Sequence, residues 1–155
     1  MAKISINIAT GSLQQQEMIV GIDLGTTNSL VAVIHPDSKK PSVLKEFDGV
    51  ALVPSVIHFG EGGIVSVGDM AKTKLIEEPQ NTIFSVKRLM GKSHNDVKQY
   101  TGFYTYKVID DNTDSLVKVQ VGDKFYSPIE LSSYILKELK KRAEHILKTP
   151  VNKAV

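Results

Sequence analysis

The sequence contains no cysteine. Disulfide bonds, thiolate metal sites and a cysteine nucleophile are therefore excluded. A cysteine-free chain fits a reducing compartment, so we expect a cytoplasmic protein. The four histidines are scattered along the chain without the spacing of metal ligands, so a histidine metal site is not expected either.

Strong charge and long apolar runs are also missing. The net charge is only +2, and the short clusters of lysine and arginine lack the interleaved aromatic residues of a nucleic-acid-binding surface. No apolar run approaches the roughly 20 residues that cross a bilayer, and residues 1–17 lack the apolar core of a signal peptide. We therefore expect neither nucleic acid nor a membrane as a partner.

What the chain does contain is typical of a globular protein. Its 155 residues are 41% hydrophobic and 23% charged, which suits one domain or a piece of a larger one. Residues 1–17 alternate isoleucine with other residues and then become rich in glutamine. This pattern predicts a flexible N-terminal arm, whose isoleucines could also add to the edge of a neighbouring sheet.

Beyond the arm, strand-like and helix-like segments alternate irregularly. We expect one helix over 69–78 and a second over 83–90, capped at its start by Asn81 and Thr82. The first helix is expected to bury Met70, Leu75 and Ile76. Apolar runs bounded by turn residues predict strands at 43–47, 52–59, 64–67, 104–109, 116–121 and 124–126, and a short helix is expected near 95–100.

The clearest helix signal begins at Ser127. This residue is a suitable N-cap, a proline follows in the first turn, and Glu130 stands at the capping-box position. The helix is expected to end near Pro150 and to pack on the opening sheet, and residues 151–155 look like the beginning of another strand. Its predicted apolar face consists of Ile129, Leu136, Leu139, Ala143, Ile146 and Leu147.

The most informative segment is 19–33, which reads as an apolar strand, a small polar turn and a second apolar strand. Gly25 allows backbone conformations closed to other residues and lets a ligand come close. The N–H groups of residues 25–28 could then converge on an anion, and Asp23 could attract a divalent metal through water. The alternative is an ordinary hairpin in which threonine and asparagine bond locally.

A second informative segment is 79–91, where Lys87 and Arg88 stand among apolar residues. A lysine in such a place is either a surface residue with a buried stem or a cation held toward a site. Opposite a phosphate-binding turn it could neutralise the charge that develops on a transferring phosphoryl group. The pattern of residues alone favours the surface reading, because most lysines are exposed.

Both segments resemble the 70-kDa heat-shock chaperones, which belong to the actin-like ATPase superfamily. Residues 19–33 are similar to the first phosphate-binding loop of that family, and 81–91 are similar to its Asn-Thr-Ile-Phe and Lys-Arg segment. The resemblance extends from Met18 to Val155, and residues 52–55 and 85–93 also resemble the bacterial iron–sulfur-assembly branch. It implies an α/β actin-like (ribonuclease H-like) fold, of which this chain contains a partial first lobe with an inserted α/β subdomain.

The resemblance also implies a division of the chain. Residues 1–17 are the flexible arm, and 18–52 are the first hairpin part of the actin-like lobe. Residues 53–127 are the inserted small α/β subdomain, and 128–155 are a crossover helix and a truncated strand of the lobe.

Residue roles follow from the resemblance position by position. Asp23 is similar to the acid that holds the hydration shell of Mg²⁺. Lys87 is similar to the lysine that positions the γ-phosphate or the attacking water, and Thr26 lies close to the γ-phosphate, so these two are the expected catalytic residues. ATP or ADP is expected to contact Gly25, Thr26, Thr27, Asn28 and Lys87.

The function that the resemblance implies is Mg-ATP hydrolysis that drives capture and release of unfolded polypeptides in folding and stress response. The implied partners are client polypeptides, a J-domain co-chaperone and a nucleotide-exchange factor. In this family the second phosphate loop, the adenosine pocket and the peptide-binding domain would lie beyond Val155. We therefore expect residues 1–155 alone to be inactive and to bind nucleotide weakly or not at all. We also expect them to self-associate through unpaired strand edges or through the exposed face of the long helix.

Two other functions stay open. A metabolite kinase of the same superfamily would use a related turn but does not share the segment around Lys87. A free-standing interaction module would use the subdomain as a docking surface and would carry no enzymatic activity.

Overall fold

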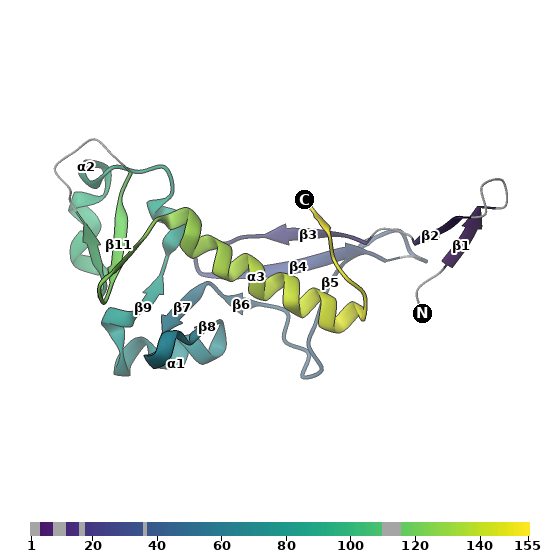
Figure 1. The fold of residues 1–155 in the computed structure, drawn as a ribbon, viewed down its shortest axis with the longest axis horizontal. Helices are drawn as coiled ribbons and strands as arrows, with labels where there is room; N and C mark the ends of the chain where they lie inside the picture. The colour runs from purple at the N-terminus through teal and green to yellow at the C-terminus, as the bar shows by residue number, and fades with distance from the viewer. Residues whose placement is uncertain (1–3, 8–11, 16–17, 36, 110–115) are drawn as a thin grey trace.

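The computed structural model describes residues 4–7, 12–15, 18–35, 37–109 and 116–155. Its main sheet combines strands from residues 19–54 with a strand at residues 153–154 (Figure 1). The central strands β3 (Ile19–Asp23) and β4 (Asn28–Ile34) are antiparallel, and β5 (Pro41–Val43) continues the sheet beyond β4. On the other side, β13 (Lys153–Ala154) pairs with β3 in parallel.

A second sheet follows directly from the first. Strand β6 (Val53–Pro54), at the predicted start of the inserted subdomain, pairs with β4 of the main sheet. After Ser55 the chain enters β7 (Val56–Phe59), the centre of a three-stranded antiparallel sheet in the order β8-β7-β9. Proline lacks the N–H needed for a ladder hydrogen bond, so Pro54 suits the break between the two strands. The remaining elements are η1 (Glu61–Gly63), β8 (Val65–Val67), α1 (Asp69–Glu77), η2 (Pro79–Asn81) and β9 (Thr82–Phe84).

The third sheet contains β10 (Lys107–Ile109), β11 (Lys118–Val121) and β12 (Lys124–Tyr126), in that order and antiparallel. It is preceded by three short helices. The sheet lies near the N-terminal end of the long helix, as does the second sheet (Figure 1). The short helices are η3 (Val86–Leu89), α2 (His94–Val97) and η4 (Lys98–Phe103).

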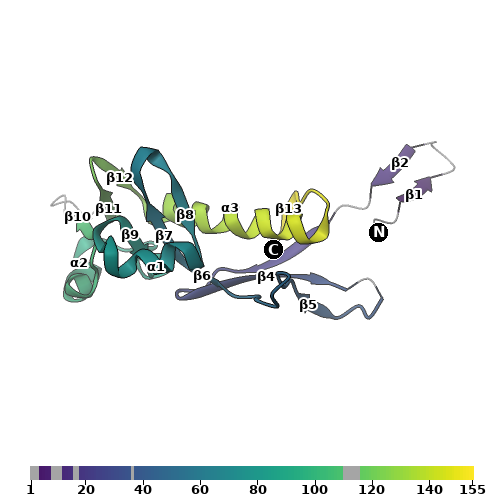
Figure 2. The same ribbon diagram turned by 90° about the horizontal axis from the view of Figure 1, so that it is seen from below.

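The long helix α3 (Pro128–Leu147) joins these parts. Ser127 and Glu130 form the predicted capping box, with the Ser127 Oγ accepting from the Glu130 N–H and the Glu130 carboxylate accepting from the Ser127 N–H. Figure 2 shows α3 as a layer over the β3–β4–β5 sheet. The same helix also contacts β7, β8 and η3.

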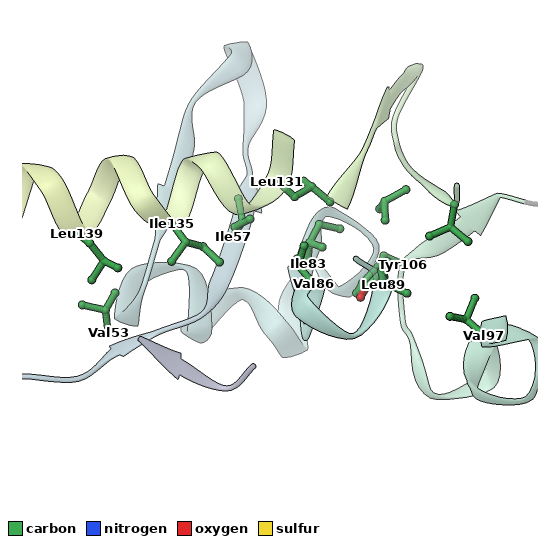
Figure 3. Packing of buried hydrophobic residues seen from close by; sticks show 12 residues of the cluster. Val53, Ile57, Ile83, Val86, Leu89, Val97, Tyr106, Leu131, Ile135 and Leu139 are labelled. Atoms are coloured by element: carbon green, nitrogen blue, oxygen red, sulfur yellow. The ribbon is translucent and has the colours of Figure 1, made fainter. Parts of the chain in front are cut away.

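The core lies under one stripe of this helix. Leu131, Ile135 and Leu139 are almost completely buried. In Figure 3, Ile135 and Leu139 point from α3 toward Ile57 and Val53 of the strands below, and Leu131 points to the side of Ile83 and Val86. Spacing of four residues keeps these side chains on one face of a helix. The buried face of α3 therefore packs against strands of both the main sheet and the second sheet.

The predicted apolar faces of two helices need correction. In α3, Leu139 and Ala143 are buried as expected, but Ile129 is 64% exposed and Leu136 is 37% exposed. In α1, only Ala71 is fully buried, whereas Met70 and Ile76 are largely exposed. Each helix has apolar residues on two adjacent faces, and the helical period alone does not show which face is buried. Contacts with strands distant in sequence determine which face points into the core.

The predicted helix over 83–90, with Asn81 and Thr82 as its cap, is wrong. Its first half is strand β9, in which Ile57 of β7 pairs with Ile83, and its second half is the short 3-10 helix η3. The Thr82 side chain does not cap a following helix. Its hydroxyl lies 2.7 Å from the carbonyl oxygen of Glu78 and 3.2 Å from that of Lys74, at the end of α1, and its one proton is donated to these acceptors. Pairing with β7 therefore overrides the local preference for a helix.

The N-terminal arm contains a two-stranded antiparallel sheet. Strand β1 (Ile4–Asn7) pairs with β2 (Ser12–Gln15), with Ile6 opposite Leu13. The isoleucine-containing strand therefore pairs within the arm instead of with the main sheet. The rest of the segment 1–17 lies outside the described residues. Among the described helices, even the 20-residue α3 is too polar to span a bilayer.

Candidate functional site

The polar turn of the opening hairpin lies between β3 and β4. Asp23 is the last residue of β3 and pairs with Leu30, so residues 24–27 form the connection. The side chains of Asp23 and Thr27 are exposed, and Thr26 is half-buried. The hairpin thus presents one carboxylate and two hydroxyl groups at a single end of the main sheet.

Gly25 has no space for a side chain. A Cβ atom at this position would collide with the backbone carbonyl oxygen of Asn28. The two arms of the turn therefore approach each other more closely than any other residue type would allow. The N–H of Gly25 already donates to the Ser29 Oγ at 3.2 Å. The N–H groups that remain available to an anion are therefore those of residues 26–28.

Two buried serines support the turn, and sequence reasoning did not identify them. Ser29 of β4 and Ser55 between β6 and β7 are 1% and 2% exposed, and their Oγ atoms are 2.9 Å apart. Ser55 also donates from its hydroxyl to the Gly25 carbonyl oxygen at 2.9 Å and from its N–H to the Thr27 carbonyl oxygen at 2.8 Å. The only sequence signal was a small hydroxyl residue within each of two otherwise apolar strand segments.

Asp23 is the candidate ligand for a metal ion. The described residues contain no group of three or more histidine, cysteine, aspartate or glutamate side chains that could enclose a metal. Magnesium keeps several of its waters and is commonly held by one or two carboxylates together with substrate phosphates. One exposed carboxylate beside a closely packed turn therefore fits hydrated Mg²⁺ bound with a phosphate, and does not fit a metal site made by the protein alone.

Lys87 lies on η3, apart from the turn. Its neighbours Val86 and Leu89 are buried, and the Lys87 side chain is exposed. Ser85, just before η3, has φ 55° and ψ 28°, the left-handed region that few residues other than glycine adopt. Such conformations cost free energy and persist only where the surroundings impose them. The backbone that presents Lys87 is therefore set by tertiary contacts.

A buried tyrosine supplies one of those contacts. The Tyr106 hydroxyl donates to the carbonyl oxygen of Phe84, the last residue of β9, at 2.6 Å. Burial raises the pKa of Tyr106 well above its ordinary value, so the hydroxyl keeps its proton and remains a donor. The Tyr106 ring also packs edge-on against Phe84 with centroids 5.5 Å apart. Together these contacts fix the chain immediately before Ser85 and η3.

The structure groups the predicted site residues in two places. Asp23, Gly25, Thr26, Thr27 and Asn28 share the turn, and no hydrogen bond or ion pair among the described residues joins Lys87 to it. The two places are nevertheless connected. Strand β6 pairs with β4 beside the turn, and its continuation β7 pairs with β9, which leads into η3. Helix α3 contacts both η3 and β4.

A comparison with protein-family models gives a match over residues 19–155, to the family described as "Hsp70 protein". The matched region begins at the first residue of β3 and includes both the turn and the segment of Lys87.

Proposed function

The chain belongs to the 70-kDa heat-shock (Hsp70) family, and on this premise we propose that it is part of the ATPase domain of a molecular chaperone. The family implies the actin-like ATPase fold, and the mixed α/β architecture is consistent with it. We assign residues 18–52 and 128–155 to the first lobe and 53–127 to an inserted subdomain. The ATPase would drive capture and release of unfolded polypeptides, with a J-domain co-chaperone and a nucleotide-exchange factor as partners.

The turn between β3 and β4 carries this proposal. Gly25 closes the turn without a side chain, and the exposed Asp23 stands beside it. In the proposed site, Asp23 orients the waters of Mg²⁺, and residues 25–28 contact the β- and γ-phosphates, with Thr26 nearest the γ-phosphate. Bound Mg-ATP supplies the phosphoryl group that is transferred to water. The protein contributes mainly positioning and electrostatic stabilisation, as is general for this reaction.

Lys87 is the proposed cation of the site. Its ammonium group can offset negative charge on the γ-phosphate or orient the attacking water. The support for this role is that Lys87 is exposed on a short helix whose backbone is fixed by a left-handed Ser85 and by buried Val86 and Leu89. Residues 52–55 and 85–93 also resemble the bacterial iron–sulfur-assembly branch of the family, and we propose that assignment for the chain.

Residues 1–155 alone are proposed to bind Mg-ATP weakly and not to hydrolyse it. The described turn offers a single carboxylate, and phosphoryl transfer depends on several charged groups placed around the phosphate. A phosphate-release assay should therefore give no signal above the protein-free background. Release above that background, abolished by Lys87→Ala, would show that these residues are sufficient for hydrolysis.

Binding can be tested without catalysis. In a titration of the 155-residue chain with millimolar Mg-ATP, the backbone amide NMR signals of residues 26–28 should shift, and Asp23→Asn should remove the dependence of the shift on Mg²⁺. Lys87→Ala should weaken binding, whereas Lys72→Ala, at an exposed position of α1, should not. If Mg-ATP shifts none of the turn amides, the proposed nucleotide site is wrong.

Self-association is proposed for the same chain. An open groove of about 430 Å³ lies between α3 and β13, and it includes Ile22, Leu24, Leu136 and Val155. Leu136 and Val155 are 37% and 90% exposed, and β13 is the end strand of the main sheet among the described residues, so a sheet edge lies beside an apolar surface. Light scattering should show association that Leu136→Lys reduces. A monomeric mass over a wide concentration range would contradict this proposal.

A further inference from the structure

The two buried serines beneath the turn form part of a closed set of hydrogen bonds. The Gly25 N–H donates to the Ser29 Oγ at 3.2 Å, and the Ser55 hydroxyl donates to the Gly25 carbonyl oxygen at 2.9 Å. The two Oγ atoms are themselves 2.9 Å apart. The ring therefore begins and ends on the same residue, Gly25.

The direction of every bond in the ring is determined. A serine hydroxyl has one proton to donate. The proton of Ser55 is used on the Gly25 carbonyl oxygen, which can only accept, so the bond between the serines must be donated by Ser29. The ring thus runs from the Gly25 N–H through Ser29 and Ser55 back to the Gly25 carbonyl. Each hydroxyl donates once and accepts once, and such chains polarise and strengthen their members.

The ring fixes both peptide groups that flank Gly25. The Gly25 carbonyl oxygen is drawn toward Ser55, and in a trans peptide the next N–H, that of Thr26, points the opposite way. The Ser55 N–H likewise draws the Thr27 carbonyl oxygen toward itself at 2.8 Å, so the Asn28 N–H also points away from Ser55. One residue therefore directs two N–H groups of the turn to the side opposite its own.

We propose that Ser29 and Ser55 are positioning residues of the turn. The carbonyl groups of Gly25 and Thr27 are held toward Ser55. The N–H groups of Thr26 and Asn28 therefore point to the opposite side, where they can donate to the phosphate of the nucleotide. This role rests on the proposed nucleotide site, but the ring itself does not depend on it. Ser55 also lies between β6 and β7, so it joins the turn to the strand that enters the second sheet.

The ring can be tested first in the unaltered chain by amide hydrogen exchange. Gly25 lies outside the strands and is only half-buried, so its N–H would exchange quickly unless the Ser29 hydroxyl holds it. We expect a clearly protected Gly25 amide. Exchange at the rate of an unstructured peptide would overturn the ring, and this measurement needs no variant that has to fold.

Variants then separate positioning from general stability. Ser55→Ala should shift the Gly25 and Thr26 amide signals and weaken Mg-ATP binding roughly tenfold, about the loss expected for one buried hydrogen bond. Ser55→Cys, which keeps the shape and a weak donor, should recover part of this loss. In the double variant Ser29→Ala/Ser55→Ala, the loss should be clearly smaller than the product of the single losses, because either change opens the same ring.

Ser132→Ala is the matched control. Ser132 is also buried, and its hydroxyl donates to the Pro128 carbonyl oxygen within α3 at 2.8 Å. This variant should lower stability without moving the turn amides or the affinity for Mg-ATP. Equal effects of Ser132→Ala and Ser55→Ala on affinity would overturn the positioning role. If Mg-ATP moves no turn amide although Gly25 is protected and Ser55→Ala releases it, the ring stands and the proposed nucleotide site fails.

Discussion

His58 of β7 and Glu78 at the end of α1 are joined by a hydrogen bond in which the His58 Nε2 and the Glu78 Oε2 are 2.9 Å apart. His58 is buried, and Glu78 also contacts the Lys74 ammonium group at 3.2 Å. The hydrogen bond from His58, followed by the one from Lys74, lowers the pKa of the Glu78 carboxyl. The Glu78 carboxylate therefore links α1 to the second sheet, and its hydrogen bonds favour the ionised form.

This pair predicts part of the acid sensitivity of the fold. Because the native pKa of Glu78 lies below the ordinary value of 4.5, its contribution to stability is complete above that pH and is lost as pH falls through the native pKa. Thermal unfolding should show a smaller loss of stability on acidification in Glu78→Gln than in the unaltered chain. Glu61→Gln, at an exposed carboxylate of η1, should leave the acid dependence unchanged. Parallel pH profiles for all three proteins would contradict the role of the pair.

Gly25→Ala should damage the turn. The added methyl group meets the backbone carbonyl of Asn28, which cannot move aside without opening the hairpin. We expect a loss of roughly 1–3 kcal/mol in the free energy of unfolding, together with shifts of the amide signals of residues 26–28. Gly21→Ala in β3 is the control, because a methyl group there comes no closer than 3.9 Å to the nearest atom, the Ala32 carbonyl oxygen.

Leu139→Ala should be one of the most destabilising substitutions in α3. The side chain is fully buried in the core cluster that includes Val53 and Ile57, so its removal leaves a cavity and should cost about 2–5 kcal/mol. Ile129→Ala on the same helix should cost much less, since Ile129 is mostly exposed. Chemical denaturation of the two variants measures the difference. Equal losses would mean that the helix faces the core with another stripe.

Ser127→Ala should loosen the start of α3. It removes the hydroxyl that accepts from the Glu130 N–H at 3.2 Å, and the loss of such a cap typically costs about 0.5–2 kcal/mol. Hydrogen exchange should become faster in the first turn of α3 and remain unchanged at its C-terminal end. Ser133→Ala is the control, because Ser133 lies inside the helix and does not cap it.

The features that the sequence predicted are those that depend on neighbouring residues. The cap of α3 lies within four residues, and the turn at 24–27 is one continuous motif, so both could be read directly. The family match over 19–155 confirms the resemblance from which the site residues were inferred. The individual roles of Asp23, Thr26 and Lys87 remain proposals.

The features that could not be predicted depend on residues far apart in the chain. Thr82 looked like a helix cap, but its hydroxyl donates to carbonyl groups at the end of α1. The strand that begins at Thr82 forms because it pairs with β7. Ser29 and Ser55 showed only as single hydroxyl residues in apolar segments, which did not reveal their role, because that role exists only once β6 lies beside β4. Likewise, the choice between two apolar stripes on α3 is made by the sheets below it.

The pairing of β3 with β13 has a consequence for the order of folding. β3 obtains β4 as a neighbour through a short turn, but its other neighbour comes from the last residues of the chain, where the Val155 N–H donates to the Val20 carbonyl oxygen at 2.9 Å. Contacts between such distant segments close large loops and slow folding. During synthesis, one edge of β3 would therefore stay unpaired until α3 and β13 have been made. In that interval the nascent chain could aggregate through this edge.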